Sequence, residues 1–269
     1  MQDDGRKVFI VAGSLCLICS FLVSTAAVTL RPRILENQRL DMQKNILQVA
    51  DIYDPAQPVG AQFNNDWRKM IVLGHRSDGS PNGNTVSMSS PPAGIDPDSF
   101  DPRKAARIDN LSTEIKNNAL PQITRRAYYS FVYEITGDDP GDDRIVLPIY
   151  GKGLWSTLYG FIALKPDCTT IAGITFYEHG ETPGLGGEVD KPDWKASWKN
   201  KLAFTENNFS SPSIRVVKGK ASGQSQIDGL SGATITSRGV NDLVRYWLGP
   251  DAFGPYLDRK RRAQKSQVE

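Results

Sequence analysis

The first long apolar stretch of the chain covers residues 8–30, VFIVAGSLCLICSFLVSTAAVTL, and contains no charged residue. Crossing the hydrocarbon core of a membrane takes roughly 20 apolar residues at about 1.5 Å of rise each, so the stretch predicts one transmembrane helix. A cleaved signal peptide is the alternative, because small residues stand at 25–27, but its apolar core is only about 7–15 residues long. The length therefore favours a retained anchor, preceded by a short segment at residues 1–7.

Residues 31–50 continue with apolar positions separated by charged ones, which fits a helix that resumes after a break at Pro32. We interpret this segment as a stalk helix. Basic residues flank the apolar stretch on both sides, so their distribution does not decide which side of the membrane the rest of the chain occupies.

A polar stretch follows at residues 77–101, SDGSPNGNTVSMSSPPAGIDPDSFD, in which Ser, Pro, Gly, Asn and Asp predominate and apolar positions are few. Such a composition favours turns and offers too little apolar surface for a packed element. We therefore expect a loop or a disordered insertion here.

Beyond Pro121 the pattern changes to short β-branched and aromatic runs, which predict strands: RAYYSFVYEI, RIVLPIY, LYGFIAL, TIAGITFY and SIRVVKG. From Val240 to Leu248 apolar residues recur at helical spacing until Gly249-Pro250, which predicts a helix. The fold class expected is α+β, with an N-terminal transmembrane helix followed by a domain at 51–257 of short, mainly antiparallel strands with flanking helices. Residues 258–269 would form a solvated basic tail, with contact to an anionic membrane surface as the alternative.

Composition narrows the functional classes. Hydrophobic residues make up 39% of the 269 residues and charged residues 23%, as is usual for a folded globular domain. The formal net charge is +2, of which the segment 258–269 contributes +3 through five basic and two acidic residues, so the remainder carries −1. No basic face for nucleic acid is implied. Cys16 and Cys19 lie in the apolar stretch, so Cys168 has no disulfide partner elsewhere in the chain.

Groups for conventional catalysis are scarce along the sequence. His75 and His179 are the only histidines, and no metal-binding or nucleotide-binding motif of known spacing occurs. We therefore assign no catalytic side chain and no metal ligand. Two loops rich in Gly, Ser and Thr remain as candidates for a binding site.

The first of these loops, EHGETPGLGG at residues 178–187, directly follows the strand TIAGITFY. A glycine-rich turn lets backbone amides approach a flat or anionic ligand closely. On composition alone, an ordinary strand-to-helix loop is as well supported as a binding site. The second loop, DGLSGATITSR at residues 228–238, opens the expected helix. Its N–H groups could bind a phosphate, or Thr236 or Ser237 could simply cap the helix.

Together with GKGLWS at residues 151–156, the two loops resemble the FMN-binding domain of NqrC, a subunit of the Na+-translocating NADH:quinone reductase. In that family the pattern Asp-x-x-Ser/Thr-Gly-Ala-Thr is the flavinylation signal, and its last threonine carries FMN through a phosphoester bond. The resemblance implies covalent FMN on Thr234, with the rest of the signal made by Asp228, Ser231, Gly232 and Ala233. It also implies a pocket for the isoalloxazine ring lined by Glu181, Thr182, Gly184 and Leu185, and completed by Gly153, Leu154 and Trp155.

The function implied by this resemblance is electron transfer by a subunit of the complex that couples NADH oxidation to ubiquinone reduction and Na+ export. The chain would be a single-pass protein of the cell inner membrane, with residues 1–7 in the cytoplasm and the FMN-binding domain extracytoplasmic, on the periplasmic side. Its partners would be the other subunits, membrane lipid and a flavin transferase. His179 is expected to fix its loop by hydrogen bonding, because flavin electron transfer does not need a protein acid at each step.

Two other interpretations stay open. The corresponding subunit of the Rnf ferredoxin:NAD+ complex shares the SGAT signal, although HGETPGLGGEV and GKGLWS resemble NqrC more closely. A binding or assembly module without flavin is the second, in which SGAT only begins a helix. No NADH site is expected in this chain under any of these interpretations, because it has no dinucleotide-binding fingerprint.

Overall fold

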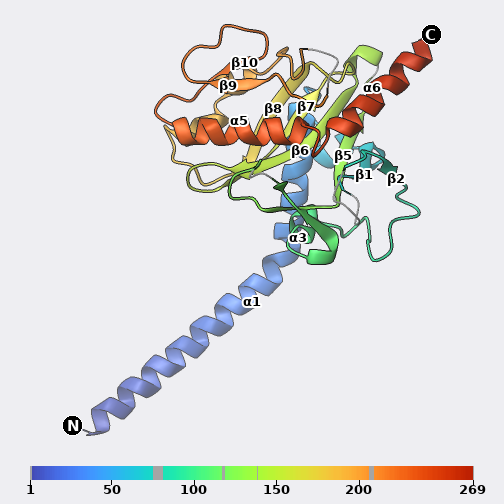
Figure 1. Ribbon diagram of the computed structural model, residues 1–269. Coiled ribbons are helices and arrows are strands. Elements are labelled where there is room, and N and C mark those ends of the chain that lie inside the picture. Colours follow the sequence, from blue (N-terminus) through green and yellow to red (C-terminus); the bar gives the residue numbers. More distant parts are fainter. Residues whose placement is uncertain (1, 75–80, 117–118, 138, 206–208, 269) are drawn as a thin grey trace. The chain divides into compact units, whose positions relative to one another are not determined.

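The computed structural model describes the whole chain except residues 1, 75–80, 117–118, 138, 206–208 and 269. It divides into two compact units, Met1–Lys44 and Asn45–Glu269. The first unit is the greater part of helix α1 (Gln2–Val49), and the second is a mixed domain of helices and strands (Figure 1).

Helix α1 contains the apolar stretch expected to cross a membrane. It includes a window of mean hydropathy 2.3 that is long enough to do so, and none of that window is buried inside the protein. The helix runs through Pro32 without interruption, so the expected break there is wrong. Proline removes one backbone donor, and the remaining hydrogen bonds of so long a helix keep it continuous.

The end of α1 belongs to the second unit. Ile46, Leu47 and Ala50 have 0% exposure, and a Cβ added to Gly173 would lie 2.8 Å from the Val49 carbonyl oxygen. The part of the expected stalk from Asn45 onward is therefore packed into the domain, because its apolar residues bury surface against the sheet.

A six-stranded sheet forms the centre of the domain, in the order β2-β1-β5-β6-β7-β8, and every neighbouring pair is antiparallel. Its strands are β1 Arg68–Val72, β2 Thr85–Val86, β5 Tyr129–Ile135, β6 Arg144–Lys152, β7 Thr157–Leu164 and β8 Ile171–Glu178. Two small pairs flank it, antiparallel β3 Ser112–Glu114 with β4 Arg125–Ala127, and parallel β9 Arg215–Val217 with β10 Gln226–Asp228. The expected α+β class with mainly antiparallel strands is confirmed.

The expected amphipathic helix is α5, Thr234–Leu248, which packs against β6 and lies across one face of the sheet (Figure 1). The main hydrophobic core includes the fully buried Trp198, Trp247 and Phe253. Short helices and turns fill the connections: α2 Val59–Gln62, η1 Asn65–Trp67, α3 Pro102–Ala105, η2 Asp109–Leu111, η4 Pro140–Asp142, η5 Gly186–Asp190 and α4 Pro192–Ala196.

The expected loop or disordered insertion at 77–101 contains packed structure in its described part, residues 81–101. Strand β2 pairs with β1 through Val86 opposite Met70, and Ile95 is buried beside Met70 and Phe131. The interpretation that no packed element forms there is wrong. A few apolar residues suffice because the sheet edge already supplies hydrogen-bonding partners and an apolar surface.

The expectation of a solvated tail at 258–269 is also wrong for the first residues of this segment. They belong to helix α6 (Gly254–Val268), which is attached to the sheet. Lys260 pairs with Glu134 of β5 at 2.7 Å, and Tyr256 donates to the same carboxylate at 2.6 Å. Burial raises the pKa of Glu134, and the bonds from Lys260 and Tyr256 outweigh it, so the net pKa is lowered. Lys260 thus attaches α6 to the sheet, which no local pattern indicated.

Candidate functional site

Three segments far apart in the sequence meet at one edge of the sheet. This edge is the one formed by the ends of the strands. Residues 153–156 form the turn between β6 and β7, and antiparallel pairing places this turn beside the end of β8, where Tyr159 lies opposite Glu178. Helix α5 passes close to this edge too, since a Cβ on Gly239 would collide with the Lys152 carbonyl oxygen. All three motifs found in the sequence therefore form one cluster.

The Glu181 carboxylate joins the three segments. Its Oε1 accepts hydrogen bonds from the N–H groups of Trp155 at 2.9 Å and Ser156 at 3.1 Å. Its Oε2 accepts from the N–H of Leu154 at 3.1 Å and from the Thr236 hydroxyl at 2.6 Å. Four donors around one buried carboxylate make this the main polar link of the cluster.

The charge of Glu181 is stabilised by these bonds. Burial raises the pKa of the carboxyl group, but the hydrogen bonds from Thr236, Trp155, Ser156 and Leu154 outweigh burial, so its pKa lies below the usual 4.5. Gly153 and Gly186 allow the close approach, because a Cβ on either would lie 2.6 Å from a Glu181 carboxylate oxygen. Both oxygens of Glu181, a residue expected to line the ring pocket, thus accept hydrogen bonds from within the protein.

The loop that carries Glu181 is held by further hydrogen bonds. His179 bonds through Nε2 to Asp190 at 2.7 Å, and its Nδ1 accepts from the Glu181 N–H at 3.2 Å. Gly180 N–H donates to the Ser156 hydroxyl at 2.6 Å. The expected loop-fixing role of His179 matches these contacts.

The Thr182 and Gly184 positions form a turn in this loop. The Thr182 carbonyl accepts from the N–H groups of Leu185 at 3.1 Å and Gly187 at 2.9 Å, while Gly184 has φ +78°. This left-handed conformation is accessible to glycine at little cost, and space around the Gly184 Cβ position is open. The turn leaves the Leu185 side chain at the surface, close to Gly232.

The start of α5 separates its hydroxyl groups onto two sides. Thr236 and Ser237 are buried; Ser237 donates to the Ala233 carbonyl at 2.9 Å and accepts from the Leu230 N–H at 2.8 Å. Capping of the helix by either residue is therefore not observed, and the residue at the N-cap, Ala233, has no side-chain hydrogen bond.

Thr234 lies on the opposite, exposed side, together with Ser231 and Gly232. Its hydroxyl makes no hydrogen bond to any of the residues that the structure describes. The carboxylate of Asp228, the first residue of the expected signal, accepts from the Ala221 N–H at 2.6 Å and fixes the turn before β10.

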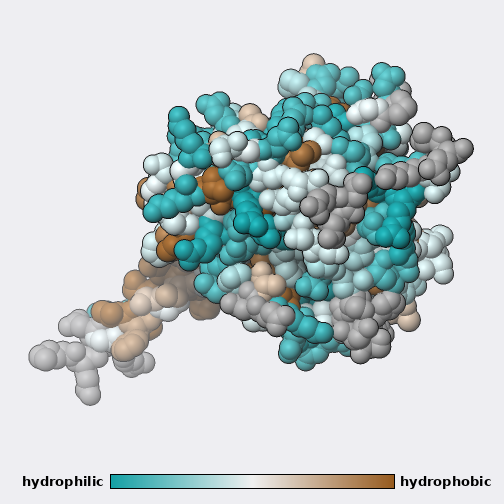
Figure 2. Space-filling view, turned by 45° about the horizontal axis from the view of Figure 1, so that its top comes forward, coloured by the Kyte–Doolittle hydropathy of each residue, from teal (hydrophilic) through white to brown (hydrophobic). Residues whose placement is uncertain are grey.

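Large apolar side chains are exposed on the same three segments. Most of the domain surface seen in Figure 2 is hydrophilic, with separate hydrophobic areas. Apart from Ile108, the large hydrophobic residues exposed in the described part of the domain all belong to the three segments: Leu154, Trp155, Leu185 and Ile235. Sequence reasoning missed Ile235, although an apolar residue next to Thr234 on the outer side of an amphipathic helix was a usable signal.

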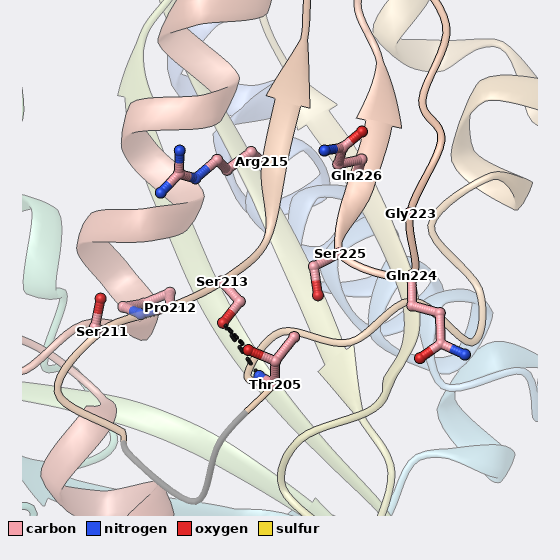
Figure 3. Close-up of a pocket in the computed structure, with 9 residues that line it drawn as sticks. All are labelled: Thr205, Ser211, Pro212, Ser213, Arg215, Gly223, Gln224, Ser225 and Gln226. Carbon is pink, nitrogen blue, oxygen red and sulfur yellow. Dashed lines mark hydrogen bonds between the residues drawn. The ribbon is translucent and has the colours of Figure 1, made fainter.

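A separate cavity of the domain does not involve these segments. It has a volume of about 440 Å³ and is lined by polar residues around Thr205 and Ser213, whose hydroxyl oxygens are 2.8 Å apart (Figure 3). Among the residues described, no group of three or more His, Cys, Asp and Glu side chains could hold a metal ion.

Comparisons with known proteins identify the domain that contains the three segments. Residues 153–249 match the FMN-binding domain family. The chain is 39% identical to the NqrC subunit of the Na(+)-translocating NADH-quinone reductase of Pseudomonas aeruginosa over 98% of both chains, and 40% identical to that of Vibrio parahaemolyticus over 97% of both. The crystal structure of Shewanella oneidensis NqrC has a TM-score of 0.72 and 31% identity, covering 84% of this chain and 99% of that one.

Proposed function

The chain belongs to the NqrC family of subunits of the Na(+)-translocating NADH-quinone reductase, and from this premise we propose that it carries FMN as a phosphoester on Thr234. It is a subunit of an NADH:quinone oxidoreductase and contains an FMN-binding domain that serves electron transport. Our proposals concern the residue to which FMN is attached, the position of its isoalloxazine ring and the orientation of the chain in the membrane.

The observation that carries the attachment site is the difference between the hydroxyl groups at the start of α5. Thr236 donates to Glu181 and Ser237 donates to Ala233, and both are buried. Thr234 is exposed, and its hydroxyl is unengaged within the described structure. A flavin transferase can therefore reach Thr234 without unfolding the helix, and the buried hydroxyls are protected from it.

The backbone around Thr234 suits an attached phosphate. Helix α5 has no side-chain cap and no acidic residue in its first turn, so its leading N–H groups lack an anionic partner there. A phosphate would be stabilised by these N–H groups and by the positive end of the helix dipole. Ser231, Gly232 and Ala233 shape the approach, with Gly232 in a left-handed conformation at φ +72°.

The isoalloxazine ring would lie against the exposed apolar side chains of Leu154, Trp155, Leu185 and Ile235, while Gly153, Thr182 and Gly184 shape the backbone beneath them. Glu181 would hold the three segments in place from below through its four hydrogen bonds. When bound, FMN would supply the electron-transfer chemistry, and the protein supplies position and surroundings.

For the membrane topology, we propose that α1 anchors the chain in the cell inner membrane through residues 8–30 and leaves residues 1–7 in the cytoplasm. The domain would then face the periplasm, as the family resemblance implies. A reporter fused after residue 269 tests this: alkaline phosphatase should be active there. Fluorescence from a reporter that matures only in the cytoplasm would contradict the orientation, and an N-terminal sequence starting near residue 27 would contradict the anchor.

The attachment is tested by producing the full-length chain with and without a flavin transferase and measuring its intact mass. One FMN less one water should be added only with the transferase, fluorescence should survive denaturation, and peptide mapping should place FMN on Thr234. Absence of flavin would favour the module without cofactor. The Rnf alternative is less supported, because the relatives from Pseudomonas aeruginosa and Vibrio parahaemolyticus, which match almost the full chain, are subunits of the Na(+)-translocating NADH-quinone reductase.

A further inference from the structure

Helix α5 begins without a negative charge of its own. Arg238 stands on the second turn, and no acidic residue occupies the first turn, where the positive end of the helix dipole would favour a negative charge. Helices α3 and α4 differ: α3 begins with an Asp101 cap, and α4 has Asp193 in its first turn. The first turn of α5 therefore has room for an anion that the protein itself does not supply.

Arg238 is also a cation without a partner in the part of the chain that the structure describes. It is exposed, and no hydrogen bond or ion pair connects it to another described residue. Lys152, the basic side chain at the end of β6, differs because it donates to the Trp155 carbonyl at 3.3 Å. Arg238 is therefore a cation available beside the proposed attachment site.

Its position relative to Thr234 suits an interaction. The two residues are four apart on α5 and both exposed, so they share one face, with their Cβ atoms roughly 5–6 Å apart. Long side chains on a helix lean toward its N-terminus, which directs Arg238 over the turn of Thr234 rather than toward Asp242, one turn later. A guanidinium group offers two parallel donors that match the oxygens of a phosphate.

We propose that Arg238 is a positioning residue that pairs with the phosphate of the flavin attached to Thr234. This inference rests on the proposed function, because it needs the phosphoester at that residue. The pair would hold the phosphate against the start of α5 and neutralise its charge on the solvent side. It would thereby restrict the attached flavin to the face formed by the three segments.

The test compares Arg238→Gln with the parent and with Arg107→Gln, a matched change of an exposed arginine elsewhere in the domain. Each full-length protein is prepared with and without FMN, and the rise in Tm on flavinylation is measured. The rise should be smaller by about 1–3 °C in Arg238→Gln and unchanged in Arg107→Gln, as expected for one exposed charge pair in a domain of this size. The difference should shrink as salt is added.

Phosphorus NMR provides a second measurement that a merely structural role would not change. The resonance of the phosphodiester should shift in Arg238→Gln and keep its position in Arg107→Gln. Identical Tm rises and identical resonances would overturn the inference while the intact mass still shows FMN. Lack of FMN on the parent protein would instead contradict the proposed function. If Arg238→Gln receives no FMN, Arg238→Lys decides: restored loading supports the charge role, and absent loading in both overturns it.

Discussion

The polar side chains on the inner and outer sides of the first turns of α5 differ in burial and in hydrogen bonding. On the inner side, Thr236 and Ser237 are buried and each hydroxyl donates a hydrogen bond. On the outer side, Thr234, Ile235 and Arg238 are exposed, and no described residue pairs with either polar side chain. The hydroxyl groups of Thr234 and Thr236, two residues apart, thus differ: the first is open to a reagent in solvent, and the second is buried and hydrogen-bonded.

The difference arises because a buried polar group must be hydrogen-bonded to offset the loss of water, whereas an exposed one can remain bonded to solvent. The inner side therefore stabilises the junction of the three segments. The outer side is left for a ligand. Substitutions on the inner side should lower the free energy of unfolding and leave the FMN content largely unchanged. Substitutions on the outer side should lower the FMN content and leave the free energy of unfolding largely unchanged.

The largest expected effect separates the two sides directly. Thr234→Ala should remove all covalent FMN, because no hydroxyl remains at the attachment position, while the free energy of unfolding of the flavin-free protein should change by less than about 0.5 kcal/mol. Thr236→Val should keep its FMN. Its free energy of unfolding should fall by about 1–2 kcal/mol, because Glu181 loses a hydrogen-bond donor. Intact mass and urea unfolding measure both. Flavin remaining on Thr234→Ala would show that another hydroxyl is modified.

A second substitution removes the inner link itself. Glu181→Ala leaves three N–H groups and one hydroxyl without their acceptor, so we expect a loss of about 3 kcal/mol in the free energy of unfolding. Urea denaturation of the flavin-free protein measures it. Glu178→Ala is a suitable control, because Glu178 is exposed and pairs at the surface with Arg103. Equal losses in the two variants would mean that the Glu181 bonds do not hold the segments together.

The glycines of the loop 178–187 sharpen the comparison. A valine at Gly186 would place Cβ 2.6 Å from both the Glu181 carboxylate and the Thr236 hydroxyl, so Gly186→Val should cost about 2–3 kcal/mol. Gly184→Val meets open space but must adopt φ +78°, which costs about 1–2 kcal/mol. Gly184→Val should retain covalent FMN and shift the flavin absorbance. Unchanged spectra and reduction rates would show that this part of the loop faces away from the ring.

The smallest expected effect is the pH dependence contributed by Glu181. Its pKa is lower in the folded protein than the usual 4.5, because the hydrogen bonds to its carboxylate outweigh burial. The corresponding stability is present above the pKa of the unfolded chain and is lost as the pH falls through the folded value. Between about pH 6 and about pH 3 the parent should therefore lose more stability than Glu181→Gln. Parallel pH profiles of the two proteins would contradict this contribution.

The sequence was informative for several elements in which a local pattern reflects a local physical requirement, although the break expected at Pro32 was not among them. An uncharged apolar run predicts a spanning helix because lipid cannot hydrogen-bond a charged group or an open backbone, and α1 contains that run. The spacing from Val240 to Leu248 predicted α5 because one face of a helix must be buried. The motifs in the loops marked the candidate site for the same reason, since close backbone approach requires glycine.

Tertiary structure decided which atoms of those motifs are engaged. No local pattern shows that Glu181 accepts from Leu154, Trp155 and Thr236, or that Lys260 pairs with Glu134, because these partners are distant in the chain. The same holds for β2, which forms only beside the edge of β1. The sequence alone determined the apolar helix, the main amphipathic helix and the loops that could hold FMN. Packing decided which threonine faces the protein and which faces solvent, because burial depends on what the rest of the fold places beside each side chain.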